Sequence, residues 1–157
     1  MMPDKLSLKR ATLAMVRAAG GVEAASNFVR VGKSKLADNY APHREDSFVA
    51  LDVVADLEPL TRGMPGWPHV TGELCRQMGG MFVARPEVTA SGAEIMVLLA
   101  RHSQEAADVT RSLCEGLADG KFDADDAART RVEVRQAMEQ LAAIDAELAA
   151  IEQESRA

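Results

Sequence analysis

Aromatic residues, cysteines and long apolar runs are scarce in this sequence of 157 residues. It has four Phe, one Trp and one Tyr, while alanine and aliphatic residues dominate, a composition that favours helices. Cys75 and Cys114 lie far apart in the chain, so we expect no disulfide framework. No apolar run approaches the roughly 18 residues of a membrane span, and the opening MMPDKLSLKR lacks the apolar stretch of a secretory signal. The sequence therefore predicts an all-α, cytoplasmic protein with no membrane partner.

Groupings typical of catalysis or metal binding are also missing from the sequence. Its three histidines, His43, His69 and His102, belong to different predicted elements, and none has the ligand spacing of a zinc site. The acidic run at residues 119–126 lacks the order of an EF-hand loop and fits instead a helix cap at Asp123. Because no nucleophile, base and orienting group can be assembled, we expect no enzyme activity, no cofactor and no metal.

The charges are distributed unevenly along the chain. Its net charge is −6, which alone argues against nucleic acid. Residues 1–45, however, hold eight basic and four acidic residues, whereas the rest of the chain holds ten basic and twenty acidic ones. A basic head on an acidic body favours an anionic partner for the head, and uneven surface composition is the alternative.

Apolar spacing in the first half predicts a compact five-helix domain over residues 1–82. The expected helices cover residues 5–19, 22–29, 33–40, 48–60 and 69–78. Ser47 is the expected N-cap of the fourth helix, whose expected buried face is Phe48, Leu51, Val54, Ala55 and Leu57. The segment MFVA at 81–84 is the one strand candidate, with an extended connector as the alternative.

The second half predicts a linker at 83–92 and an antiparallel helical hairpin at 93–157. Apolar residues recur at steps of three and four from Ile95 to Leu117 and again from Val134 to Ile151. An amphipathic helix does not bury its apolar stripe alone, so the hairpin needs a further partner surface. A second chain, giving a dimer or higher homo-oligomer, and packing back onto the head are both open.

The stretch VRVGKSKLADNY at 29–40 carries the sequence's most specific functional signal. Gly32-Lys33-Ser34 is how a nucleotide-binding P-loop ends, but Asn27 stands where that motif requires its first glycine. The preceding segment also reads as a helix and not as the required strand. The other interpretation is a helix-turn-helix, in which the first turn of the second helix meets base edges or phosphates. A solvated helical turn without a ligand is the alternative to both.

The run GGVEAASNFVRVGKSKLADNY resembles the helix-turn-helix of the phage regulatory protein CII family. The segments SFVALDVVADLEPLTRGMP and ELCRQMGGMFV are similar to the family's fourth and fifth helices, and HSQEAADVTRSLCEGLADGKFDADDAARTRVEVRQAMEQLAAIDAEL resembles its C-terminal helical pair. The resemblance implies a lambda-repressor-like DNA-binding domain with contacts from Lys33, Ser34, Lys35, Asp38 and Tyr40. With the flanking Arg30, His43 and Arg44, these residues form the predicted DNA-binding set.

Two functions therefore come from the sequence. The first is a sequence-specific transcriptional regulator of phage or prophage type, which binds double-stranded DNA with the helix that starts near Lys33 and oligomerises through its hairpin. RNA polymerase or another regulator would be a further partner. The alternative is a non-catalytic adaptor whose acidic C-terminal hairpin binds a partner protein.

Overall fold

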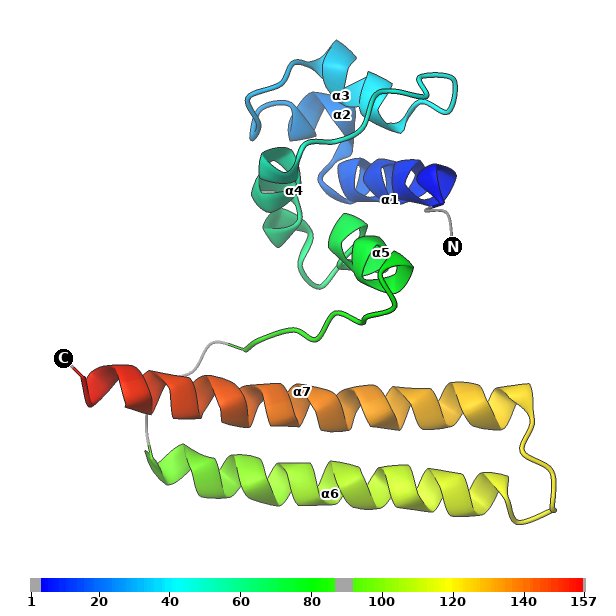
Figure 1. The fold of residues 1–157 in the computed structure, drawn as a ribbon, viewed down its shortest axis with the longest axis vertical. Coiled ribbons are helices and arrows are strands. Elements are labelled where there is room, and N and C mark those ends of the chain that lie inside the picture. The colour runs from blue at the N-terminus through cyan, green and yellow to red at the C-terminus, as the bar shows by residue number, and fades with distance from the viewer. Residues whose placement is uncertain (1–3, 87–91, 157) are drawn as a thin grey trace. The chain divides into compact units, whose positions relative to one another are not determined.

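The computed structural model describes residues 4–86 and 92–156 of the chain, and for Gly92 and Ala93 the backbone alone. The described residues contain seven α-helices, one short 3₁₀ helix and no strand, which confirms the all-α prediction (Figure 1). Residues 81–84 form an extended connector and no strand. The chain divides into two compact units, Met1–Phe82 and Val83–Ala157. None of the described helices is both long and apolar enough to cross a membrane.

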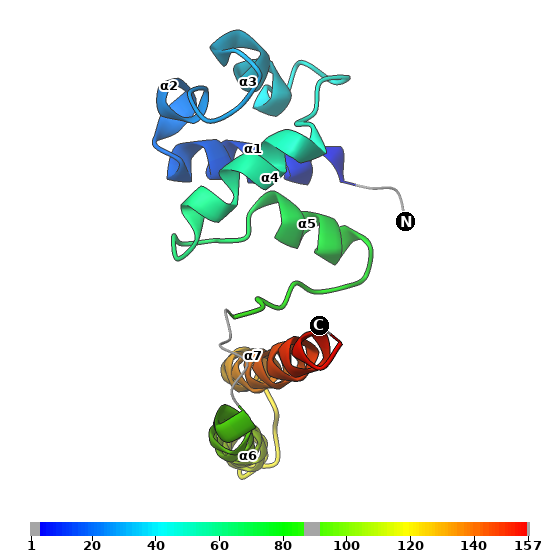
Figure 2. The same ribbon diagram turned by 90° about the vertical axis from the view of Figure 1, so that its left-hand side faces the viewer.

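The first unit is built around its first helix. Its elements are α1 (Lys5–Ala18), α2 (Gly21–Ala25), α3 (Lys33–Tyr40), α4 (Leu51–Leu57), η1 (Pro59–Thr61) and α5 (Val70–Gln77). In both ribbon views α1 lies between α2 and α3 on one side and α5 on the other (Figure 2). The core consists of apolar residues from all five α-helices, among them Met15, Val16, Ala25, Leu36, Val53, Leu57 and Val70.

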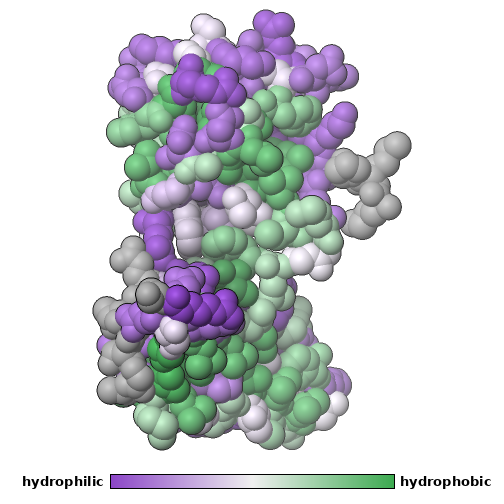
Figure 3. Space-filling model, turned by 60° about the vertical axis from the view of Figure 1, so that its left-hand side comes forward, coloured by the Kyte–Doolittle hydropathy of each residue, from purple (hydrophilic) through white to green (hydrophobic). Residues whose placement is uncertain are grey.

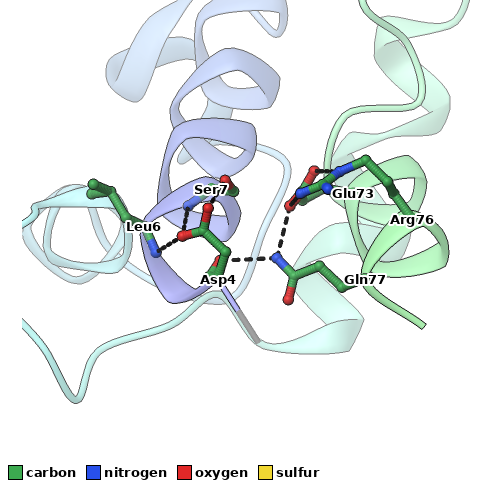
Figure 4. A network of polar contacts seen from close by, with 6 residues as sticks. All are labelled: Asp4, Leu6, Ser7, Glu73, Arg76 and Gln77. Carbon is green, nitrogen blue, oxygen red and sulfur yellow. Dashed lines mark hydrogen bonds and ion pairs between the residues drawn. The ribbon is translucent and has the colours of Figure 1, made fainter. Parts of the chain in front are cut away.

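Polar contacts fasten the start of α1 to α5. The Asp4 carboxylate accepts hydrogen bonds from the backbone N–H groups of Leu6 (3.1 Å) and Ser7 (3.0 Å), which caps α1. Hydrogen bonds from the Ser7 side chain and backbone hold the pKa of Asp4 below its usual range. The Asp4 carbonyl accepts from Gln77 Nε2 at 2.8 Å, and the same nitrogen donates to Glu73 at 2.7 Å (Figure 4). Helices from opposite ends of the unit are thereby joined.

The fourth helix differs from its prediction. It begins at Leu51 with Ala50 at the N-cap position, so the predicted Ser47 cap is wrong. The Ser47 hydroxyl instead lies 3.0 Å from the side-chain amide of Asn39. Leu51 is 76 % exposed and Ala55 is also exposed, whereas Val53 is fully buried. Val54 and Leu57 of the predicted face are buried, and Val53 joins them in the core in place of Leu51 and Ala55.

Glu58 organises the chain between α4 and α5 from a buried position. Its carboxylate accepts hydrogen bonds from the backbone N–H groups of Val70 and of Thr71, the latter at 3.0 Å. These N–H groups belong to the first turn of α5, where backbone N–H groups have no hydrogen-bond partner within the helix. The N-cap residue of α5, His69, does not cap them with its side chain. The Glu58 carbonyl also accepts from Trp67 Nε1 at 3.1 Å. A single acidic residue therefore fixes both the loop and the start of α5.

The second unit is a pair of helices, α6 (Gly92–Gly116) and α7 (Ala124–Glu154), which pack against each other in antiparallel directions (Figure 1). Asp123 caps α7, as predicted, and forms a capping box with Asp126. Hydrogen bonds from the backbone N–H groups of Asp126 and Asp125 hold the pKa of Asp123 below its usual range. The tight connection brings Phe122 so close to α6 that a Cβ on Gly116 would lie 2.7 Å from its ring.

Candidate nucleic-acid interface

A short connection between α2 and α3 leads into the first helical turn of α3. Backbone hydrogen bonds from Asn27 to Ala24 and from Phe28 to Ala25, both 3.1 Å, continue the helical winding beyond the end of α2. The chain then turns at residues 29–32 and enters α3 from Gly32, which has an extended backbone (φ −73°, ψ 165°). No side chain caps this end of α3, so its first N–H groups face outward without a side-chain partner.

Residues of α3 separate into an inward and an outward face. Leu36 and Asn39 are buried, and Leu36 belongs to the core. Lys33, Ser34 and Lys35 are exposed on the first turn. Three residues of the predicted DNA-binding set are thus exposed on the first turn, where the positive end of the helix dipole adds to the two lysine charges.

Hydrogen bonds and ion pairs engage the basic side chains near this turn. Lys33 Nζ lies 2.7 Å from a Glu23 carboxylate oxygen, and Lys35 Nζ lies 3.0 Å from the Ser47 hydroxyl. The lysine and the glutamate of the first pair are both more than half exposed, so water screens their attraction. A phosphate oxygen could replace the Glu23 carboxylate at little free-energy cost.

Two further ion pairs flank the turn. Arg30 pairs with Asp52 at the start of α4, and Arg44 lies 3.2 Å from Asp38. The hydrogen bond between Arg30 and Asp52 raises the pKa of the guanidinium and lowers the pKa of the carboxyl group. These acids reduce the positive field around α3, although all four side chains remain at least 40 % exposed.

The remaining members of the predicted set lie at the other end of α3. Tyr40 is half-buried and packs against the core, so its ring is shared between the interior and the surface. His43 is exposed in the loop that follows. The structure therefore groups Lys33, Ser34 and Lys35 at the start of α3. Asp38 and Tyr40 lie in its last turn, His43 and Arg44 in the loop that follows, and Arg30 beside the turn before it.

Lys9 has a role that its place in the sequence does not reveal. It counts among the basic residues of the head, but it is only 3 % exposed. Its Nζ donates to the backbone carbonyls of Ser47 (2.6 Å) and Asn39 (3.3 Å), and it lies 4.6 Å from the centroid of the Phe48 ring. Burial lowers the pKa of this lysine.

The position of Lys9 supports α3 from its C-terminal end. The Asn39 carbonyl belongs to the last turn of α3, where carbonyl groups lack partners within the helix and the dipole favours a cation. Lys9 thus joins α1 to the end of α3 and to the loop before α4. A spacing signal was present in the sequence, because Lys9 shares a stripe with the buried Thr12 and Val16 at steps of three and four.

No group of three or more His, Cys, Asp or Glu side chains is arranged to hold a metal ion within residues 4–86 and 94–156. Comparison of the chain with protein-family models, with curated proteins and with solved structures gave no match.

Proposed function

We propose that this protein is a sequence-specific DNA-binding transcriptional regulator of phage or prophage type that reads the major groove with α3. The observation that carries the proposal is the first turn of α3, which holds Lys33, Ser34 and Lys35 exposed together while Leu36 anchors the helix in the core. The resemblance of residues 20–40 to the CII-family helix-turn-helix supports the same function.

The dimensions of this element suit the groove. An α-helix with its side chains is about 10–12 Å wide, and the major groove of B-DNA is about 12 Å wide. The turn at residues 29–32 has the length of a helix-turn-helix connection, which is typically three to four residues. Two copies with their α3 helices about 34 Å apart would recognise a two-part site.

In this proposal the residues have separate roles. Lys33 and Lys35 contact phosphates or guanine edges, and Ser34 contacts a base or the backbone. Arg30 and Arg44 exchange their carboxylate partners for phosphates as the protein docks. Asp38 accepts a hydrogen bond from a cytosine amino group where the site provides one.

The test begins with selection of bound sequences from a random duplex pool, because the operator is unknown. We expect the wild-type protein to enrich a specific sequence. Lys33→Ala and Lys35→Ala should each weaken binding to it by about 1–3 kcal/mol per specific contact. Lys121→Ala is the matched control, because Lys121 is an exposed lysine in the second unit, and it should bind like the wild type. Failure to enrich any sequence would contradict the proposal.

The same variants separate this function from the adaptor alternative. An adaptor that acts through its acidic hairpin requires neither Lys33 nor Lys35, and truncation of the chain after Val88 should abolish its activity. A regulator should keep specific, though weaker, DNA contacts in the truncated head.

A further inference from the structure

Near the connection, the two helices of the hairpin face each other with residues that are polar or small. The hydroxyl groups of Ser112 and Thr130 lie 2.9 Å apart, and a Cβ on Gly116 would lie 3.1 Å from Asp126 Cβ. A step of four residues along α6 therefore corresponds to four residues backward along α7. Thr130 and Glu147 are buried, and both occupy α7 positions reached from Asp126 by alternating steps of four and three.

Apolar residues lie mainly one position after these interface residues, and they are left uncovered. On α6 they are Met96, Leu99, Ala106 and Leu113, and Leu117 follows directly after the helix; all five are exposed. On α7 they are Val134, Met138, Leu141 and Leu148, of which Met138 is half-buried and the other three are exposed. About half of the predicted apolar seams therefore lie outside the contact between the two helices, whereas Ile95, Val109 and Ile144 are half-buried.

Both stripes lie on the same side of the hairpin. One residue further along an α-helix turns the side chain by about 100°. Because α6 and α7 run in opposite directions, this rotation is clockwise for one helix and anticlockwise for the other when both are viewed from the same end. The apolar residues of both helices therefore point to the same side of the hairpin. We call this side the apolar face. In the space-filling view hydrophobic residues gather over the hairpin (Figure 3).

The apolar face is large enough for a stable dimer. A helix of 25 residues such as α6 is about 37 Å long, and two adjacent helices are about 20 Å wide. One face thus offers about 750 Å², close to the roughly 800 Å² per partner of a typical specific interface. Between Met96 and Leu117 the α6 stripe, at steps of three and four, contains no charged residue.

The charges on the α7 stripe indicate which molecule covers the face. Arg131 and Asp145 continue this stripe, seven residues before and seven residues after Met138. Both are exposed, and neither forms an ion pair with another residue in the described part of the chain. An antiparallel second α7 that crosses at Met138 places each Arg131 beside Asp145 of the other copy. The pattern is self-complementary under a two-fold axis.

The same axis also matches the α6 stripe. With α7 crossing its copy at Met138, α6 crosses its own copy between Ser103 and Ala106, where small side chains allow close approach. Met96 then lies near Leu113 of the second copy. The other two-fold arrangement, with α7 over α6 of the second copy, would place Arg131 beside Thr110 and Asp145 beside Met96, so neither charge would have an opposite partner.

We infer that the apolar face is the homodimer interface, formed by a second copy of this chain as an antiparallel four-helix bundle with α7 on α7 and α6 on α6. This inference deepens the proposed function by defining the surface that would pair two DNA-reading heads. It does not depend on DNA binding, and its test contains no DNA.

Sedimentation equilibrium of the full chain tests it. We expect the wild type to be a dimer at micromolar concentration. Arg131→Asp and Asp145→Arg, each of which places like charges together at two symmetric contacts, should raise the dimer dissociation constant about tenfold in low salt. The double variant Arg131→Asp/Asp145→Arg should restore it. Glu154→Arg is the matched control, because this substitution reverses the same charge at an exposed residue about 160° around α7 from Met138.

Leu113→Glu should raise the dissociation constant at least a hundredfold while circular dichroism shows retained helicity. A wild-type monomer at tens of micromolar would overturn the inference. So would charge variants that dimerise like the wild type, or a double variant that fails to recover. Loss of DNA selection with an intact dimer would contradict the proposed function alone.

Discussion

Replacement of Lys9 by methionine tests how the head holds α3 in place. Lys9 makes two hydrogen bonds to backbone carbonyls and one contact with the Phe48 ring. Hydrogen bonds to charged groups contribute about 1.5–3 kcal/mol each, and a cation over an aromatic ring about 0.5–2 kcal/mol. The penalty for burying the ammonium group, which also lowers its pKa, opposes these contributions.

We therefore expect Lys9→Met to lower the free energy of unfolding of the head by about 2 kcal/mol, with methionine filling the space of the lysine stem. For a unit of this size that corresponds to a fall of about 8–16 °C in the midpoint of thermal unfolding. The sole tryptophan, Trp67, belongs to the first unit, so its fluorescence reports unfolding of the head.

Arg10→Met is the control for this experiment, because Arg10 is the exposed neighbour of Lys9 on the same helix. It should change the stability by less than about 0.5 kcal/mol. If Lys9→Met unfolds at the same midpoint as the wild type, the assignment of Lys9 as the support of α3 is wrong. DNA affinity should also fall in Lys9→Met, although Lys9 does not reach the surface.

Three further predictions concern other polar groups. Glu58→Ala leaves two N–H groups at the start of α5 unpaired and should destabilise the head by about 2–4 kcal/mol in urea unfolding, whereas Glu58→Gln should recover part of the loss. Burial lowers the pKa of His69 below 6.5, so the folded state resists its protonation and stability should decline as the pH falls through 6.5 until the folded-state pKa is passed. His69→Gln should remove that slope, and an unchanged slope would show that another group causes it. Asp123→Ala should lower the melting midpoint of the hairpin by a few degrees above pH 4 and converge with the wild type in acid, because the capping carboxylate with its lowered pKa is then protonated.

Local patterns predicted the helices well. Apolar spacing indicated α1, α3, α6 and α7, and the Asp123 cap follows from the chemistry of a helix N-terminus. Within the proposed DNA-reading helix, the inward position of Leu36 and the exposure of Lys33 and Lys35 agree with the pattern.

What the sequence did not reveal depends on interactions between residues far apart in the chain. In the sequence, Lys9 resembles an ordinary surface cation. In the structure, its ammonium group is buried and donates hydrogen bonds to the backbone carbonyls of Asn39 and Ser47. In the sequence, Glu58 resembles a solvated acid. In the structure, its carboxylate accepts hydrogen bonds from the first N–H groups of α5. Many apolar residues predicted to lie between the two helices of the hairpin are exposed instead. Their spacing indicates an apolar side of each helix but does not specify which part of that side contacts the other helix.

The measurement that tests the central claim most directly is the salt dependence of binding to the selected duplex. If a dimer neutralises about eight phosphates, the logarithm of the affinity should fall against the logarithm of the salt concentration with a slope near −7. Replacing Lys33 and Lys35 by alanine in both copies should make the slope shallower by about 1 for each phosphate that the protein then leaves unneutralised. A slope near zero, or a slope that the two substitutions leave unchanged, would contradict a regulator that reads DNA with α3.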